Sequence, residues 1–430
     1  MNFRGWIEEL RANGKLTEAK KPLSSHLEAA AFIKVLEPKP TLLHVQGSEI
    51  PVAANICASR SLIAGYLNIE PSQIVPKLLE AIEHPTKPQM VDNPPCFEIS
   101  EKGVDLDSLP LLFHAEKDGG KYISSAVVIA HHPEIGQNVS FHRLMVIGKD
   151  ELAIRILPRH LQTFLDKSKG DLPIAICIGN ATNVLLAGAC SVELGKDELE
   201  IANSLEPLRV ANCAEAKCTV PAESEYVLVG RITGQMHQEG PFIDLTETYD
   251  LVRPQRVVKI DHIYHRERPI YHALVPGGLE HKMLMGTPRE PTIYREVSKV
   301  CDCADVFITP GGASWLHGIV KIRKKQEDDG RKAIEAAFRG HTSMKHVLIV
   351  DEDINITDPM EVEWAFATRF QGDRGLLIKA GETGSSLDPS ADPVTRKTTK
   401  VGFDATKPLE VKGKNFEKAK FPEVDWTKFT

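Results

Sequence analysis

The sequence predicts a mixed α/β (α+β) protein of three units, in which a central split β-barrel lies between two α/β domains. Three observations support this fold class. Helical and strand-like segments alternate over residues 1–100, short β-like runs dominate residues 101–290, and alternation returns over residues 291–430. Alternating elements are typical of layered α/β sheets, whereas many short strands separated by turns are typical of barrels.

The first unit shows helical spacing of apolar residues near its start, as in Phe3, Trp6, Ile7 and Leu10. Four prolines in residues 84–95 predict a linker to the second unit. The strand-like and helical segments before that linker are predicted as helices 3–10, 27–35 and 76–82 and strands 41–45 and 51–56.

The central unit is predicted to be built around a hairpin from Asn138 to His160. Apolar residues alternate with polar ones on both sides of a turn at 148–150. The remaining β-like runs of this unit are 122–130, 174–178, 184–187, 226–232 and 257–263.

The last unit is predicted to form a second open sheet, suited to self-association. A helix is expected to begin after Asp358, with Pro359 in its first turn. The sequence from residue 380 onward is rich in Gly, Ser, Lys and Thr and is predicted to be a poorly structured tail. The other elements are helices 292–300 and 331–338 and strands 304–312, 315–322 and 346–353.

Composition excludes several classes of function. A net charge of −7 gives no indication of nucleic-acid binding or of an anionic membrane partner. No apolar run approaches the 18 residues of a spanning helix, and the amphipathic start does not resemble a secretory signal, so we expect a cytoplasmic protein. The eight cysteines show no CxxC pair and no metal-binding spacing.

Polar residues stand at the open end of the predicted hairpin. Asn138 opens its first strand, Arg143 interrupts the apolar face, and Arg159 and His160 close the second strand. Antiparallel pairing would make Asn138 and His160 neighbours. An amide oxygen beside an imidazole is half of a site for a hard divalent cation, and Arg143 could meet an anion. The alternative is a hairpin end with solvated polar side chains.

Two acidic segments are further candidates. Glu239 and Asp244 are separated by a Gly-Pro pair that disturbs strand register, so both carboxylates could converge on one pocket. One of them would then tend to hold a proton, while an arginine between them would keep the other ionised. A solvated loop is the alternative. Glu198 and Glu200 lie on different faces of a predicted helix, so only one of them could point at the Asn138 corner.

Seven segments occur in an order that resembles the UbiD family of reversible decarboxylases, which use prenylated FMN. The resemblance extends from about residue 3 to residue 410, and the ordered set is specific although each segment alone is not. The segments are DGGKYIS, NVSFHR, PRHL, VPAESEYVLVG, EGPFID, EWAFATRF and KVGFDATKP.

The resemblance implies roles for individual residues. It makes the central unit a flavin-binding domain with a Mn²⁺ or Mg²⁺ ion that clips the cofactor in place. Relatives carry hydroxyl groups at the positions of residues 188–190, where this chain has small residues, so the resemblance leaves open whether a K⁺ ion is bound. The implied metal ligands are Asn138, His160 and Glu198, with Glu200 as the alternative to Glu198, and the implied catalytic residues are Arg143, Glu239 and Asp244. The implied cofactor-binding residues are the metal ligands together with Phe141, His142, Arg143, Arg159 and Lys400. Arg159 stands where many relatives have Gln, and Lys400 would contact the phosphate of the cofactor.

The resemblance also implies the reaction, which is non-oxidative decarboxylation of an α,β-unsaturated acid. The compact length favours the archaeal type that acts on trans-anhydromevalonate 5-phosphate in isoprenoid biosynthesis, and a cationic stretch at 262–282 would suit a substrate phosphate. The runner-up substrate is a phenolic or 4-hydroxybenzoate-type acid. A metal-dependent hydrolase and a non-catalytic flavin-binding subunit remain as alternative functions from other functional classes. Expected partners are a flavin prenyltransferase that supplies the cofactor and further copies of the chain in a homodimer or higher oligomer.

Overall fold

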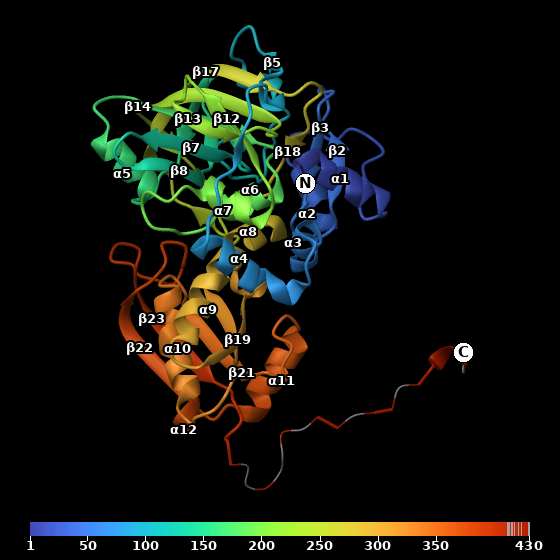
Figure 1. The fold of residues 1–430 in the computed structure, drawn as a ribbon, viewed down its shortest axis with the longest axis vertical. Coiled ribbons are helices and arrows are strands. Elements are labelled where there is room, and N and C mark those ends of the chain that lie inside the picture. The colour runs from blue at the N-terminus through green and yellow to red at the C-terminus, as the bar shows by residue number, and fades with distance from the viewer. Residues whose placement is uncertain (411–412, 414–415, 417, 420, 423, 429–430) are drawn as a thin grey trace.

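The structure, a computed structural model, describes residues 1–410, 413, 416, 418–419, 421–422 and 424–428. The N-terminal unit lies beside the central sheet, and the C-terminal unit lies beneath both (Figure 1). Helices α4, Ile74–Glu83, and α9, Glu290–Ser298, pack against each other where the units meet. The predicted mixed α/β class is therefore confirmed, and the boundaries of the three units stay a prediction.

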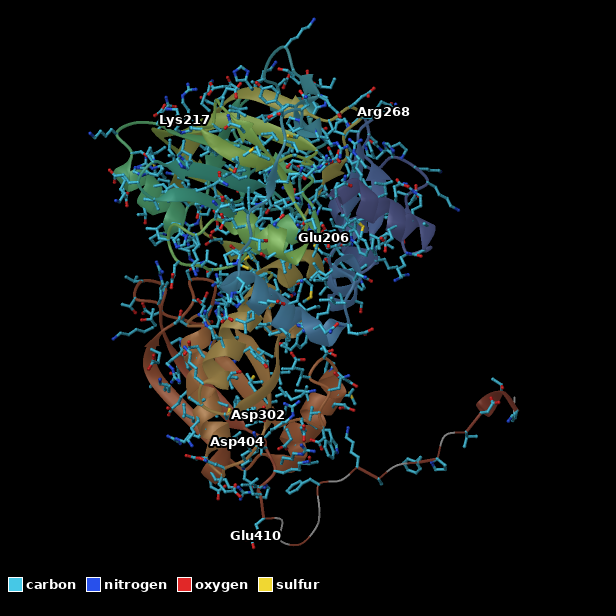
Figure 2. The ribbon with its side chains drawn as sticks, in the orientation of Figure 1. Glu206, Lys217, Arg268, Asp302, Asp404 and Glu410 are labelled. Carbon is cyan, nitrogen blue, oxygen red and sulfur yellow. The ribbon has the colours of Figure 1, made fainter. Side chains whose placement is uncertain are left out.

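The N-terminal unit is a four-stranded sheet with helices, and it receives a strand from much later in the chain. Its strand order is β1-β2-β3-β18, so the chain returns to this sheet after the central unit. Phe3, Trp6, Ile7 and Leu10 are buried, as the helical spacing predicts. Glu206, labelled in Figure 2, lies in the central unit. The amino group of Met1 pairs with it at 2.9 Å, which ties the start of the chain to that unit. The elements are α1 Phe3–Ala12, β1 Thr17–Glu18, α2 Glu28–Leu36, β2 Thr41–His44, β3 Pro51–Ala54, α3 Arg60–Leu67 and β18 Tyr271–His272.

The central unit is a nine-stranded sheet that remains open, as a split barrel requires. Its order is β6-β9-β10-β17-β14-β11-β7-β8, with β5 added at β17. Both faces are covered, because Val127 and Ile129 join one apolar cluster while Val128 and Ala130 join the other. Its strands are β5 Ile99–Ser100, β6 Tyr122–Ile123, β7 Val127–His132, β8 Gly136–Phe141, β9 Leu144–Val146, β10 Glu151–Ile154, β11 Leu172–Ile178, β14 Tyr226–Glu239 and β17 Arg253–His265.

Smaller elements surround this sheet. A short sheet is formed by β4, Gln89–Met90, which lies in the predicted linker, with β12, Arg209–Cys213, and β13, Cys218–Pro221. A separate hairpin is formed by β15, Phe242–Ile243, and β16, Tyr249–Asp250. The helices are α5 His160–Lys167, α6 Thr182–Gly188, α7 Glu198–Leu205 and α8 Leu279–Gly286.

Two predictions for the central unit are wrong. The segment from Asn138 is not one hairpin arm, because the strand is interrupted at His142 and Arg143; β8 pairs with β7, and only β9 pairs with β10. Residues 184–187 belong to helix α6 instead of a strand. Every residue of α6 is buried, and the four apolar residues 184–187 form too short a run to show a period that separates helix from strand.

The C-terminal unit is a five-stranded sheet of order β19-β20-β21-β23-β22 between two helical layers. Helices α9 and α10 pack on one face and α11 on the other. The predicted cap is confirmed, since Asp358 accepts a hydrogen bond from Met360 N and Pro359 begins α11. The elements are β19 Asp302–Ile308, β20 His317–Arg323, α10 Asp329–Gly340, β21 His346–Asp351, α11 Pro359–Arg369, α12 Gly372–Gly375, β22 Leu376–Thr383 and β23 Lys397–Asp404.

The predicted tail is wrong for residues 380–383 and 397–404, which belong to strands β22 and β23. Strand β23 lies inside the sheet, parallel to β21 and antiparallel to β22. The polar composition of β23 does not predict a strand. Hydrogen bonds to two neighbouring strands hold it in place, and only Lys400 and Gly402 of this strand are buried.

Candidate active site

A cavity of about 600 Å³ opens between the central sheet and the C-terminal unit. Strand β8, the residues after β10, the start of α7 and the β15–β16 hairpin contribute from the central side. Arg289, Trp315 and the loop of Ser385 contribute from the C-terminal side. The charged or polar lining residues of the central side include Asn138, Ser140, His142, Arg143, Arg155, Arg159, His160, Glu198, Asp244, Asp250, Arg253 and His281.

Arg143 is the centre of an acidic network in this cavity. Its Nε and Nη2 donate to the two oxygens of Glu239 at 2.9 and 3.0 Å, and its Nη1 donates to Asp244 at 3.0 Å. Nη2 also donates to Asp250 at 2.8 Å. Four of its five N–H groups are therefore used, and one hydrogen on Nη1 remains for a ligand.

An aromatic ring holds the guanidinium of Arg143 in place, and a tyrosine hydroxyl holds its partner Glu239. It lies over the ring of Phe242 at 4.7 Å, and Tyr122 donates to Glu239 from the other side at 3.1 Å. The side chain of Glu239 is 0% exposed and does not line the cavity, whereas that of Asp244 is 20% exposed and does. Glu239 therefore positions Arg143 from behind, and Asp244 is the acid that faces a bound molecule.

Asp250 completes the network and links it to two more arginines. It accepts from Arg253 at 2.7 Å, and Arg155 lies 3.9 Å away. Although burial raises the pKa of Asp250, its hydrogen bond from Arg253 and the charge of Arg143 bring that pKa below its ordinary value. Asp250 is therefore held ionised as a bridge between Arg143 and Arg253.

Asn138, His160 and Glu198 line the same cavity, although the predicted hairpin does not bring them there. Asn138 lies on β8, His160 begins α5, and Glu198 begins α7. Glu198 Oε2 accepts from Val139 N at 2.8 Å, and no cation of the described chain pairs with this buried carboxylate. Burial raises the pKa of Glu198 to about 8.

A relay of hydrogen bonds fixes the orientation of Asn138. His142 Nδ1 faces the carbonyl oxygen of Arg155 at 2.9 Å and so carries the ring hydrogen. Nε2 then accepts from the Ser140 hydroxyl at 3.0 Å, and Ser140 Oγ accepts from the Asn138 amide nitrogen at 2.9 Å. The amide oxygen of Asn138 is left without a hydrogen bond from the described residues.

The predicted site residues fall into two groups. Asn138, Phe141, His142, Arg143, Arg159, His160, Glu198 and Asp244 line the cavity, with Glu239 directly behind it. Lys400 does not line it: its Nζ donates to Thr342 O and lies over the ring of Phe338. Glu200 also lies outside the lining, and of the cationic residues at 262–282 only His281 reaches it.

Sequence reasoning missed Asp250, Arg155, Arg253 and Arg289. Asp250 stands six residues after Asp244, a spacing that allows a short hairpin to return the chain to the same place. The arginines carry no such signal, because their neighbours in space come from other elements.

Models of one family account for nearly the whole chain. The N-terminal, Rift-related and C-terminal domains of 3-octaprenyl-4-hydroxybenzoate carboxy-lyase match residues 7–82, 89–279 and 282–405. The chain belongs to the UbiD family. Its membership and its relatives identify it as a carboxy-lyase.

Relatives within the UbiD family resemble the chain over nearly their full length. The anhydromevalonate phosphate decarboxylase of Methanothermobacter thermautotrophicus is 43% identical, over 95% of this chain and 97% of the relative. The enzyme of the same name from Methanosarcina mazei is also 43% identical, over 98% and 100%.

Solved UbiD structures agree with the fold. The UbiD-class enzyme HmfF of Pelotomaculum thermopropionicum in complex with FMN has a TM-score of 0.95 and 38% identity, covering 99% of this chain and 98% of that one. An evolved dimeric form of HmfF in complex with prFMN has a TM-score of 0.92 and 36% identity, with full coverage of both chains.

Two absences among the described residues bear on metals and membranes. The described residues contain no group of three or more His, Cys, Asp or Glu side chains arranged to hold a metal ion. Asn138, His160 and Glu198 bring one amide, one imidazole and one carboxylate to the wall of the cavity. In the part of the chain that the structure describes, no helix is both long and apolar enough to cross a membrane.

The relay through His142 predicts a pH dependence of stability. Burial lowers the pKa of His142 to about 4, from an ordinary value of 6.5. Between these values the unfolded chain binds a proton that the folded chain does not, so the free energy of unfolding decreases as the pH falls from 6.5 toward 4. We expect urea denaturation to show this decrease in the wild type relative to His142→Gln, and a pH-independent difference between the two proteins would contradict it.

Proposed function

We propose that the protein decarboxylates anhydromevalonate phosphate with a prenylated FMN and a divalent metal ion. The observation that carries the proposal is the guanidinium of Arg143, which is bound by Glu239, Asp244 and Asp250 and lines a cavity of suitable size. The name shared by the similar archaeal enzymes supports this substrate. The complexes of HmfF support the flavin.

The metal would be held by Asn138, His160 and Glu198. Burial and the charge of Arg159 lower the pKa of His160, so the imidazole is available as a neutral ligand. Glu198 is a buried carboxylate without a cationic partner among the described residues, and the relay leaves the Asn138 oxygen open. This donor set suits Mn²⁺ or Mg²⁺, which would neutralise Glu198 and hold the flavin phosphate. The small residues Gly188, Ala189 and Cys190 offer little to a K⁺ ion.

Different residues of the chain would bind the substrate and transfer the proton. The bound flavin supplies the electron sink that the loss of CO₂ requires. The remaining hydrogen of Arg143 Nη1 would bind the substrate carboxylate and orient the bond to be broken. Asp244, whose side chain reaches the cavity, would take up a proton from solvent and give it to the carbon that CO₂ has left after the carbon–carbon bond breaks.

Other copies of the chain and a supplier of the cofactor are further parts of the proposal. A homo-oligomer is supported by the dimeric form of the similar HmfF. A flavin prenyltransferase would supply the prenylated FMN. The predicted cytoplasmic location is kept as part of this proposal.

The test compares two acids and one isosteric variant. Protein is co-expressed with a flavin prenyltransferase, purified with Mn²⁺ and assayed for CO₂ release from anhydromevalonate phosphate and from 4-hydroxybenzoate. We expect turnover of the phosphorylated acid, and a fall in kcat of roughly 10²–10³-fold for Asp244→Asn, because the amide cannot deliver the proton.

The matched control is Asp166→Asn, the same chemical change on an exposed face of α5. It should leave kcat unchanged. Turnover confined to 4-hydroxybenzoate would overturn the proposed substrate, and full turnover by Asp244→Asn would overturn the proposed proton donor.

A further inference from the structure

A second cavity of about 270 Å³ adjoins the first on the side of the C-terminal unit. The two cavities share part of their wall. The shared residues are Arg159, Ser191, Arg289, Trp315 and Ser343.

This second cavity is strongly cationic. Beyond the shared wall it is lined by Arg295, Arg339 and His341, and its one acidic lining residue is Glu296. Glu296 is already paired with Lys299 and lies 3.9 Å from Arg339. The lining therefore carries an excess of positive charge that no acid in it balances.

Arg289 is held in place by an aromatic ring and not by an acid. Its guanidinium lies over the ring of Trp315 at 5.2 Å, and its Nε makes no hydrogen bond within the described chain. Trp315 is fixed in turn, because its Nε1 donates to Ser385 Oγ at 3.0 Å and its carbonyl oxygen contacts His341 Nε2 at 3.0 Å.

Arg159 is the second unpaired cation of the shared wall. Within the described chain its side chain has no ion pair or hydrogen bond. Arg159 is exposed and Arg289 is half-buried, and both side chains line the wall that the two cavities share.

Two arginines elsewhere in the described chain show what this pair lacks. Arg60 pairs with Glu290, the residue next to Arg289, and Arg369 pairs with Asp351 at 2.7 Å. Arg159 and Arg289 place two positive charges on one cavity wall without an acidic partner among the described residues, and a ligand of charge −2 would neutralise both. A phosphate monoester has that charge and the planar groups of arginine match its oxygens.

We propose that Arg159 and Arg289 form a phosphate-monoester site and that the phosphate of the acid substrate occupies it. This inference rests on the proposed function. The shared wall lets a molecule whose carboxylate lies at Arg143 reach both guanidinium groups, since Arg143, Arg159 and Arg289 line one cavity. Arg289 is thus a specificity-determining residue that selects a phosphorylated acid.

The flavin also carries a phosphate monoester, so the test must separate the two sources. The variant is Arg289→Gln in the flavin-loaded protein, and the matched control is Arg295→Gln, which removes the same charge from an exposed residue that lines only the second cavity. Flavin content is measured by absorption and mass. Binding of inorganic phosphate is measured by calorimetry, and kcat and KM are measured with the phosphorylated acid.

We expect Arg289→Gln to keep its flavin, to bind inorganic phosphate about 10-fold or more weakly, and to raise KM about 30-fold or more with kcat within about threefold. Arg289→Lys should restore part of the affinity, and Arg295→Gln should change little. Equal melting temperatures would show that the variants are folded.

Two results would overturn the inference. Loss of flavin from folded Arg289→Gln would assign the site to the flavin phosphate, and unchanged affinity for inorganic phosphate would show that Arg289 binds no phosphate. If wild-type protein binds inorganic phosphate through Arg289 and keeps its flavin but does not turn over anhydromevalonate phosphate, the anion site stands and the proposed substrate fails.

Discussion

Replacing Arg143 by Ala is expected to abolish decarboxylation and to destabilise the protein. The carboxylates of Glu239, Asp244 and Asp250 would lose their shared cation, and Glu239 would keep only Tyr122 as a partner. An uncompensated buried carboxylate costs roughly 3–5 kcal/mol of unfolding free energy. Loss of the group that orients the substrate should lower kcat/KM by at least ~10³-fold.

Denaturant unfolding and CO₂ release measure the two effects separately. Arg143→Lys is the matched control, because it keeps the positive charge but cannot reach three carboxylates at once. It should recover much of the stability and little of the activity. An Arg143→Ala protein with wild-type turnover would show that the network is structural only.

Replacing Glu198 by Gln is expected to remove both the metal and the flavin. The amide can still accept the hydrogen bond from Val139 N, so local structure should persist while the negative charge is lost. A divalent ion held by one carboxylate depends on that charge, and the flavin phosphate would lose its clip in turn. Elemental analysis for Mn and the mass of the bound flavin are the measurements.

Glu200→Gln is the control, because it makes the same change on the same helix outside the cavity lining. It should retain both ligands. Stoichiometric Mn in Glu198→Gln would remove Glu198 from the proposed ligand set, and flavin retained without Mn would show that the metal does not hold the cofactor.

The sequence indicates the acidic network better than it indicates the metal corner. The Gly-Pro pair after Glu239 ends β14, the chain restarts at Phe242, and the side chains of Glu239 and Asp244 meet at Arg143 as the broken register predicts. Local backbone chemistry decides this convergence, so it can be seen in the sequence.

The metal corner was predicted from an incorrect pairing. Asn138 and His160 do line one cavity, but Asn138 pairs across to β7, and His160 belongs to a helix. Pairing partners in a nine-stranded sheet are chosen by packing on both faces, which alternation along one segment does not reveal. For the same reason Arg289 could not be connected with Arg159, since 130 residues separate them in the chain.

The break between β8 and β9 makes the length of this segment matter more than its composition. Phe141 ends β8 and Leu144 begins β9. The two residues between them have different roles, because His142 belongs to the relay that orients Asn138 and Arg143 binds the acidic side chains. A substitution here alters one task at a time. An inserted or deleted residue would displace both side chains at once and move the side chains of the following strand to its opposite face, so natural variants of this protein should keep the number of residues between Asn138 and Leu144 unchanged.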